Sequence, residues 1–324
     1  MTIAIVALLV LLALLGLPLF VALAGGSLLA TFNAGLDPAL LAVELNRLAS
    51  SPYLASIPLF TFAGVVLAAG GAPERMIQLF NALVGWLPGG MAGVTLTSCA
   101  FFTAFSGASG VTILALGGLM FPMLLHAGYR ERFNLGLLTT SGSLGLLFPP
   151  SLAILLYGIV AGVNIDKLFL AGIVPGLLLM LILALYCLYI GRKTNAPRHR
   201  FSLRTLGRAS KEGFWDMLLP VGVIVGIFGG YVTISEASAC TAVYVLLLEG
   251  VIHREIHLVR HLPALLRDAA ILVGSILIIL SVAMGLTNLL IDAQVPMKIL
   301  GWMETHIDSQ LQFLMLLNVF LLVV

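Results

Sequence analysis

The stretch Phe105-Ser106-Gly107-Ala108-Ser109-Gly110-Val111-Thr112 is a short polar segment inside a strongly apolar chain. A second one follows, from Thr139-Thr140-Ser141-Gly142-Ser143 to Phe148-Pro149-Pro150-Ser151. Lipid offers no partners to backbone N–H and C=O groups, so Gly and Pro breaks in a membrane helix are tolerated only where they line a cavity within the protein. The two stretches therefore predict a site for a substrate or an ion.

The composition predicts an all-α polytopic membrane protein. Of the 324 residues 60% are hydrophobic and 9% are charged, far from the soluble average. Apolar stretches that can cross a bilayer, which needs about 20 residues, lie at 3–30, 53–70, 168–190 and 269–290, and shorter or interrupted ones at 91–124, 134–162, 217–250 and 311–324. A net charge of +2, without basic runs among aromatics, argues against nucleic-acid binding.

Two further features fit a membrane protein. The three cysteines, Cys99, Cys187 and Cys240, lie in apolar segments without paired spacing, so we expect small buried hydrophobes rather than disulfides or metal ligands. The first apolar run has no preceding Lys or Arg and exceeds a signal-peptide core, so it is interpreted as a first membrane helix.

The positions of the cations predict the orientation in the membrane, because Lys and Arg are retained in short cytoplasmic loops. Seven of the sixteen lie in 191–211 and three more in 254–267. Between these loops, 217–250 must cross an even number of times, as two short spans meeting near Thr233-Ile234-Ser235-Glu236. The resulting topology leaves Arg47, Lys167 and Lys298 on the opposite side.

An internal similarity suggests a repeat. Residues 74–88 and 294–308 each carry polar or small residues at helical spacing, and each follows a long apolar span. Both are predicted to be amphipathic helices at the membrane surface. If the halves run in opposite directions they form an inverted repeat, as in many secondary transporters, with a cytoplasmic N-terminus. Two unrelated surface helices are the alternative. The participating positions are Glu74, Gln78, Asn81 and Gly85, and Gln294, Lys298, Gly301 and Thr305.

The repeat carries a further expectation about length. The counterpart of Ser106 would fall just beyond Val324, where the sequence stops. We therefore expect a C-terminally incomplete protein that lacks about the last quarter of the architecture.

The residues of the two stretches are suited to weak coordination rather than to bond making. Ser106, Ser109 and Thr112 supply hydroxyls, and Gly107 and Gly110 allow the backbone to turn and expose carbonyls, which are ligands that hard cations prefer. The second stretch is interpreted as an unwound helix whose half-helix dipoles point into a cavity. A kinked helix packed through small residues is the alternative.

These residues resemble a known family, the large membrane subunit of tripartite ATP-independent periplasmic (TRAP) transporters, within a superfamily of elevator-type carriers. The similarity runs along essentially the whole chain. The strings that carry it are Ile57-Pro58-Leu59-Phe60, Leu87-Pro88-Gly89-Gly90, Ser106-Gly107-Ala108-Ser109, Phe148-Pro149-Pro150-Ser151, Leu155-Leu156-Tyr157-Gly158, Leu168-Phe169-Leu170-Ala171-Gly172-Ile173-Val174-Pro175-Gly176, Ile234-Ser235-Glu236-Ala237 and Ala242-Val243-Tyr244.

The resemblance implies an inverted-repeat, elevator-type transporter in the bacterial or archaeal cytoplasmic (inner) membrane, with its second repeat truncated. The first repeat, 1–190, would contain the interfacial arm 74–88, a re-entrant helical hairpin at about 91–124 and a broken helix at 134–162. A basic cytoplasmic loop, 191–216, would join it to the incomplete second repeat, 217–324.

The resemblance also implies a function: import of an organic acid (a carboxylate) with sodium as coupling ion and without a cofactor. The implied partners are a small four-helix membrane subunit and a periplasmic substrate-binding protein. The family often has Asp where this chain has Thr112, which removes a negative charge from the sodium site. The implied sodium ligands are Ser106, Gly107, Thr112, Ser141, Ser143 and Gly145, and the implied substrate-binding residues are Ser109, Pro149, Pro150 and Ser151.

Other interpretations stay open at this point. Glu236 lies within an apolar block, where an ionisable group indicates function, although Thr233 or Ser235 could form a helix cap there. His253, His257 and His261 recur every four residues, and a wet helix face is expected rather than a metal site. A channel or antiporter would need ionisable residues in the hairpin, and a membrane-embedded enzyme would need a convergent catalytic set.

Overall fold

The computed structural model describes residues 11–35, 39–107, 109–194, 201–307 and 309–323, and all the regular elements within these ranges are helices. The chain divides into two compact units, one made of residues 50–274 and the other of 1–49 with 275–324. These two units are not the two repeats predicted from the sequence. The repeats are inferred from internal similarity, and that division stays a prediction.

The smaller unit contains α2 (Leu19–Ala34), α3 (Ala39–Ala49), the end of the long helix α14 (Leu258–Asp292), α15 (Val295–His306) and α16 (Gln310–Val323). The described part of the predicted span 3–30 is not one continuous helix. Residues 11–14 are helical, the chain turns at Gly16, whose φ is 104°, and α2 begins after Pro18. A glycine in this conformation followed closely by a residue without a backbone N–H ends a helix.

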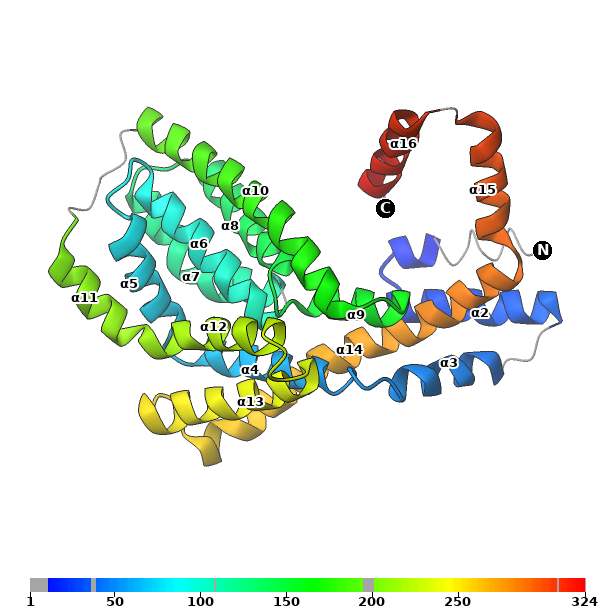
Figure 1. Ribbon diagram of the computed structural model, residues 1–324, viewed down its shortest axis with the longest axis horizontal. Coiled ribbons are helices and arrows are strands. Elements are labelled where there is room, and N and C mark those ends of the chain that lie inside the picture. The colour runs from blue at the N-terminus through cyan, green and yellow to red at the C-terminus, as the bar shows by residue number, and fades with distance from the viewer. Residues whose placement is uncertain (1–10, 36–38, 108, 195–200, 308, 324) are drawn as a thin grey trace. The chain divides into compact units, whose positions relative to one another are not determined.

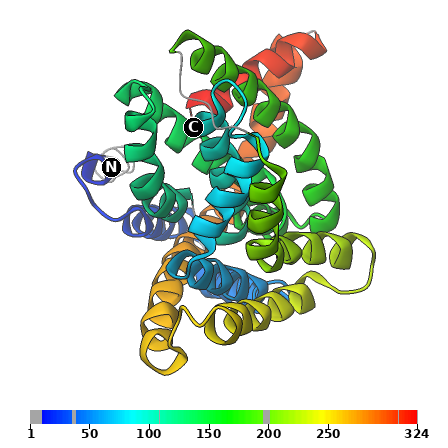
Figure 2. The same cartoon turned by 90° about the vertical axis from the view of Figure 1, so that its left-hand side faces the viewer.

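The larger unit is a bundle built around α6, which packs against α4, α5, α7, α8 and α10. Figure 1 shows α6, α7, α8 and α10 side by side, and both views place α4 beside α13 (Figures 1 and 2). The helices of the unit are α4 (Ser56–Ala69), α5 (Ala72–Val84), α6 (Gly90–Ser106), α7 (Ser109–His126), α8 (Glu131–Leu144), α9 (Leu152–Ala161), α10 (Ile165–Lys193), α11 (Leu203–Glu212), α12 (Phe214–Phe228), α13 (Ile234–Leu247) and the start of α14.

The helix lengths agree with a polytopic membrane protein. Within the described residues, four helical segments are long and apolar enough to cross a bilayer: 109–126, 165–193, 234–252 and 259–292. Two further pairs qualify only when each is counted as one bent span, namely α4 with α5 and α8 with α9, whose axes turn by 76° and 47°. The block 217–250 is indeed two helices, α12 and α13, separated at residues 229–233.

Both predicted surface helices form, and the polar face of the first one, α5, is only partly exposed. In α5, Glu74 and Gln78 are exposed, whereas Asn81 is half-buried because α11 packs along this helix. Gly85 is buried and lies just beyond the end of α5. The corresponding α15 has no buried residue among those described, and residue 308 of its predicted range lies outside the described part.

Two smaller expectations are wrong. The three histidines do not line one helix face, because a π-helical turn (Leu248–Ile252) ends at His253 and α14 begins only after His257. Cys99 and Cys187 are buried and free as expected, but Cys240 is exposed on the surface of the protein. A cysteine thiol behaves as a small hydrophobic group, so it can lie on a protein surface that faces lipid.

Candidate substrate and ion site

The first polar stretch forms a tight helical hairpin. α6 ends at Ser106, Gly107 takes a left-handed conformation with φ of 63°, and α7 begins at Ser109. The hydroxyls of Ser106 and Thr112 lie across this turn, buried and 2.9 Å apart, so they form a hydrogen bond. Ala108 lies outside the described residues.

The second stretch breaks later than expected. α8 continues to Leu144, a 3-10 turn covers Gly145–Leu147, and an extended segment with a cis Pro149-Pro150 bond leads to α9. The residue before a proline is disfavoured in the helical region, and proline itself cannot donate to the helix ladder. The double proline, rather than the serines, therefore sets the break.

The prediction that the chain unwinds at Ser141 and Ser143 is wrong. Both residues are helical, and their hydroxyls donate to the carbonyls one turn earlier: Ser141 to Leu137 at 2.5 Å and Ser143 to Thr139 at 3.1 Å. Serine often satisfies its hydroxyl in this way within a helix. Ser141 is fully buried, whereas Ser143 is exposed on the protein surface.

The two breaks touch one another, as the sequence analysis expects for a shared site. A Cβ atom added at Gly107 would lie 2.5 Å from Leu152 Cβ, at the start of α9. A Cβ atom added at Gly142 would lie 2.6 Å from Ile113 Cγ1 and 3.7 Å from the Ser109 carbonyl oxygen. Glycine at both positions thus permits the hairpin and the broken helix to pack in contact. Their depth in a bilayer stays a prediction.

The third glycine, Gly145, packs on α6. A Cβ atom there would collide with the Ala100 carbonyl and lie 2.5 Å from Thr103 Cβ. The Thr103 hydroxyl is buried and has no hydrogen-bond partner within the described residues. Thr103 precedes Ser106 by one helical turn and so lies on the same face of α6. The spacing of three residues between Thr103 and Ser106 could have indicated from the sequence that Thr103 also lies near the site.

The four predicted substrate-binding residues are adjacent to the breaks but differ in their surroundings. Pro149, Pro150 and Ser151 are buried, and Ser109 is half-buried. Ser151 is the N-cap of α9, its hydroxyl accepting a bond from the Ile154 N–H at 3.4 Å. Pro149 also lines a cavity of about 310 Å³ whose lining residues are all apolar except Thr97. Such a cavity would not compensate the desolvation of a carboxylate.

A buried ion cluster lies elsewhere in the larger unit, and sequence reasoning missed it. Arg75 at the start of α5 donates to both carboxylate oxygens of Asp216, at 2.7 and 3.0 Å, to Glu249 at 2.5 Å and to Glu255 at 2.9 Å. The Glu249 side chain is completely buried, whereas that of Glu255 is 39% exposed. One guanidinium thus joins α5, α12, the π-helical turn and the following loop.

Glu255 and the nearby His253 lie outside the spanning segments, and the pKa values of both side chains are shifted. Burial opposes the charge on Glu255, but hydrogen bonds from Arg75 and from the Gly71 N–H outweigh it, so the pKa of Glu255 lies below its ordinary value. Burial, and then the charge of Arg75, lower the pKa of His253. At neutral pH both shifts favour an ionised Glu255 beside a neutral His253.

Glu236 is a helix cap. Its carboxylate accepts bonds from the Thr233 N–H at 2.8 Å and the Thr233 hydroxyl at 2.9 Å, and the Glu236 N–H donates back to that hydroxyl. This capping box starts α13. The alternative that the sequence left open for Glu236 is therefore confirmed, with Thr233 rather than Ser235 as partner, since the Ser235 hydroxyl donates to the Pro52 carbonyl.

Comparison with known proteins identifies the family. The profile of a single family, described as the DctM component of tripartite ATP-independent periplasmic transporters, matches residues 5–324. The chain belongs to this family. It is a family of transporter permeases and not of enzymes, so the enzyme hypothesis is dropped.

Individual TRAP permeases resemble the chain over most of its length. The C4-dicarboxylate TRAP transporter large permease protein DctM of Pseudomonas aeruginosa is 33% identical over 284 residues, covering 87% of this chain and 66% of the relative. The isethionate TRAP transporter permease protein DctMQ of Oleidesulfovibrio alaskensis is 33% identical over 314 residues, covering 95% and 49%. The ectoine permease TeaC of Halomonas elongata is 31% identical, covering 93% and 71%. The chain spans about two thirds or less of the length of the first two relatives.

Proposed function

We propose that this chain belongs to a TRAP permease that imports an organic acid across the bacterial or archaeal inner membrane together with sodium ions. The observation that carries the proposal is the contact between the Gly107 hairpin and the broken helix around Pro149, within a chain that matches the permease family from residue 5 to residue 324. Two interrupted helices that meet in the protein interior are the usual setting of a transported ligand.

The sodium site is proposed at the hairpin. Ser106 and Thr112 present two buried hydroxyl oxygens 2.9 Å apart, and Gly107 exposes backbone beside them. A hydroxyl that donates a hydrogen bond keeps its lone pairs, so Ser141, although bonded to Leu137, can still offer an oxygen to a cation. Neutral oxygens of this kind suit a hard monovalent cation. Gly145 completes the proposed set from the broken helix, whereas Ser143 is left out of it, because Ser143 is exposed and does not share a helix face with the buried Ser141.

The substrate is proposed to bind beside the sodium, near Ser109 and the segment Pro149 to Ser151. Two relatives are named for organic anions, C4-dicarboxylates and isethionate. The start of α9, where Ser151 caps the Ile154 N–H, provides the positive end of a helix dipole, which is suited to an anion. A small four-helix membrane subunit and a periplasmic binding protein are the proposed partners, and the name DctMQ of one relative agrees with a permease that joins two components.

Transport assays test the sodium assignment. In the complete transporter, with both partners present, Ser106→Ala and Ser141→Ala should each raise the sodium concentration for half-maximal uptake, by about tenfold if one ion–oxygen contact is lost. Thr139→Ala is the matched control, because its hydroxyl bonds the Leu135 carbonyl on the same helix but is exposed. Sodium dependence that is unchanged in both serine variants would contradict the assignment.

A further inference from the structure

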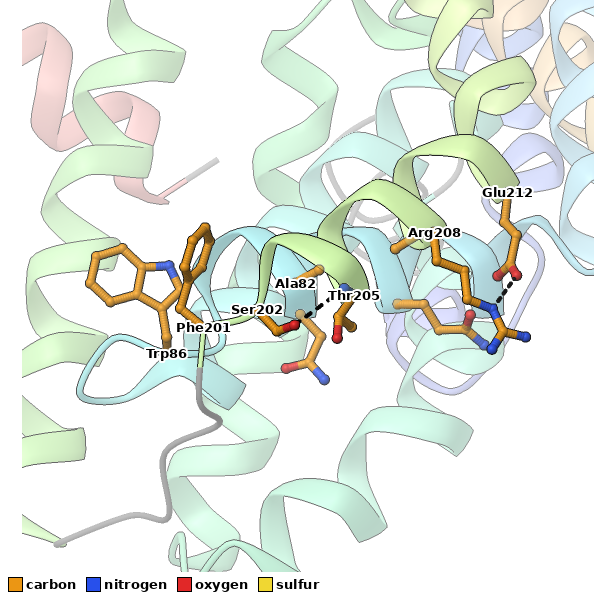
Figure 3. Close-up of a pocket in the computed structure, with 10 residues that line it drawn as sticks. Ala82, Trp86, Phe201, Ser202, Thr205, Arg208 and Glu212 are labelled. Atoms are coloured by element: carbon orange, nitrogen blue, oxygen red, sulfur yellow. Dashed lines mark hydrogen bonds and ion pairs between the residues drawn. The ribbon is translucent and has the colours of Figure 1, made fainter.

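A polar groove lies between α5 and α11, and none of the residues that line it belongs to the hairpin or to the broken helix. It has a volume of about 400 Å³. The side chains of Trp86 and Phe201 lie at one end and those of Arg208 and Glu212 at the other (Figure 3). The amide side chains of Gln78 and Asn81 contribute to the α5 wall. The groove therefore combines an aromatic end, a charged end and neutral hydrogen-bonding groups.

The sequence around the groove fits a membrane surface. α11 lies between the end of α10 at Lys193 and the start of α12 at Phe214, two apolar helices, so it connects them outside the hydrocarbon. The rings of Trp86 and Phe201 pack edge to face with centroids 6.0 Å apart. Aromatic side chains of this kind are enriched at the level of lipid head groups.

The charge of this region favours an anionic occupant. Residues 191–212 contain seven cations and one acid, Glu212. Basic clusters on an amphipathic helix next to a membrane span attract anionic lipids. At the groove itself, Arg208 Nε donates to Glu212 Oε1 at 3.0 Å. This pair is exposed and spaced i,i+4, so it is weak, and it occupies one of the five N–H donors of the guanidinium.

The α5 wall supplies neutral polar groups. The side-chain amides of Gln78 and Asn81 line this wall of the groove, and Ser202 and Thr205 line the α11 wall. An amide can donate and accept hydrogen bonds, so such groups suit ligand hydroxyls. A ligand with both a phosphate and hydroxyls would therefore use both sides of the groove.

We propose that the groove between α5 and α11 binds the head group of an anionic phospholipid such as phosphatidylglycerol, with its phosphate at Arg208 and its glycerol hydroxyls along the wall that carries the side-chain amides of Gln78 and Asn81. The proposal rests on the membrane location in the proposed function. Bound lipid would tie the arm helix α5 to the basic segment on the same membrane surface.

Lipid retention measured by native mass spectrometry tests this proposal. The permease with its membrane partner, taken from nanodiscs of phosphatidylglycerol and phosphatidylcholine, should retain phosphatidylglycerol preferentially. Arg208→Gln should lower that retention about tenfold, since a hydrogen bond to a charged group contributes at least a factor of this order. Glu212→Gln should raise it. Asn81→Ala should reduce the preference for a head group with hydroxyls over phosphatidic acid.

Arg204→Gln is the matched control, because Arg204 carries the same charge on the same helix and does not line the groove. Equal losses in the Arg204 and Arg208 variants would show general attraction to a basic surface and overturn the proposal, as would unchanged retention in Arg208→Gln. Displacement of the lipid by inorganic phosphate or glycerol phosphate would indicate a soluble ligand and also overturn it. Because the readout is lipid retention, failure here is distinct from failure of the sodium-uptake test.

Discussion

The hairpin with the broken helix and the Arg75 cluster are two regions of the larger unit that contain buried polar groups, and they are built in opposite ways. The first contains glycines and neutral hydroxyls, and several of those hydroxyls bond carbonyls of their own helix, as in Ser141 and Ser143. The second contains charges that are satisfied only across long sequence separations, from Arg75 to Asp216, Glu249 and Glu255.

This difference separates stability from function. A hydroxyl bonded within its own helix can lose or gain a ligand with little consequence for the fold, because its hydrogen bond is local. A buried carboxylate whose countercharge is removed is left uncompensated in a medium of low dielectric constant, which is strongly unfavourable. The Arg75 cluster is therefore expected to hold the larger unit together, while the breaks remain available to a transported ligand.

The largest expected effect comes from removing the shared cation. Arg75→Leu leaves three carboxylates around an apolar side chain, and breaking a buried ion pair in this way should destabilise the protein by about 3–5 kcal/mol. Arg75→Lys should lie between this variant and the wild type, because lysine keeps the charge but not the planar fork that reaches three partners. Chemical denaturation of the purified protein in detergent measures both values.

An exposed arginine serves as the control for that experiment. Arg208→Gln removes an i,i+4 pair in which the arginine side chain is 82% exposed, and it should change the free energy of unfolding by less than about 1 kcal/mol. If Arg75→Leu were no less stable than Arg208→Gln, the cluster would have no structural role.

The ion cluster illustrates what the sequence does not predict. The positive-inside pattern treats Arg75 as one more cytoplasmic cation, which describes its position in the chain but not its partners. Those partners come from α12, the π-helical turn and the loop before α14, so the contacts arise only from tertiary packing. No local spacing relates residues this far apart, and helical periodicity reports only neighbours within a few turns.

A glycine substitution should have an intermediate effect and tests how tightly the breaks are packed. Gly145→Ala places a methyl group against the Ala100 carbonyl and Thr103 Cβ, which are parts of a helix backbone and a buried side chain. Overpacking of this kind should destabilise the protein by about 1–3 kcal/mol. Thermal unfolding of the purified chain, followed by circular dichroism, measures the change.

Gly110→Ala is the matched substitution at the other break. A Cβ atom at Gly110 would meet no atom of the described residues within 4 Å, and Gly110 lies in the first turn of α7. The change should be neutral or stabilising by up to about 1 kcal/mol, because alanine is the better helix former. Equal destabilisation by both substitutions would mean that the close packing at Gly145 is not the cause.

The breaks themselves could be predicted in part. Gly107 marks the hairpin because a left-handed residue between two helices favours glycine, and Pro149-Pro150 marks the end of the helical backbone. The serines lead to a wrong position for the unwinding. A serine hydroxyl in a membrane helix can hydrogen-bond to the carbonyl four residues earlier as well as to a ligand, so its presence does not show that the helix is broken. Polarity therefore indicates where a site lies, while proline and glycine indicate where the helix stops.

The smallest expected effect concerns pH. The pKa of Glu255 is lower in the folded protein than its unfolded value of about 4.3, so its ionised form stabilises the fold above that pH. The contribution is lost as pH falls through the folded pKa. The difference in free energy of unfolding between wild type and Glu255→Gln should therefore be positive at neutral pH and shrink toward zero in acid. The side chain is 39% exposed, so solvent screening keeps the difference small.

The same titration with Glu212→Gln separates the cluster from the surface, because Glu212 pairs only with the exposed Arg208 in the described structure. If the free energy of unfolding of the wild type exceeded that of Glu255→Gln by an amount that grew as pH fell below 4, the lowered pKa would be contradicted. Such a result would require that the folded protein favours the protonated form of Glu255. An advantage that disappears in acid would show that the hydrogen bonds from Arg75 and from the Gly71 N–H favour the ionised form of Glu255.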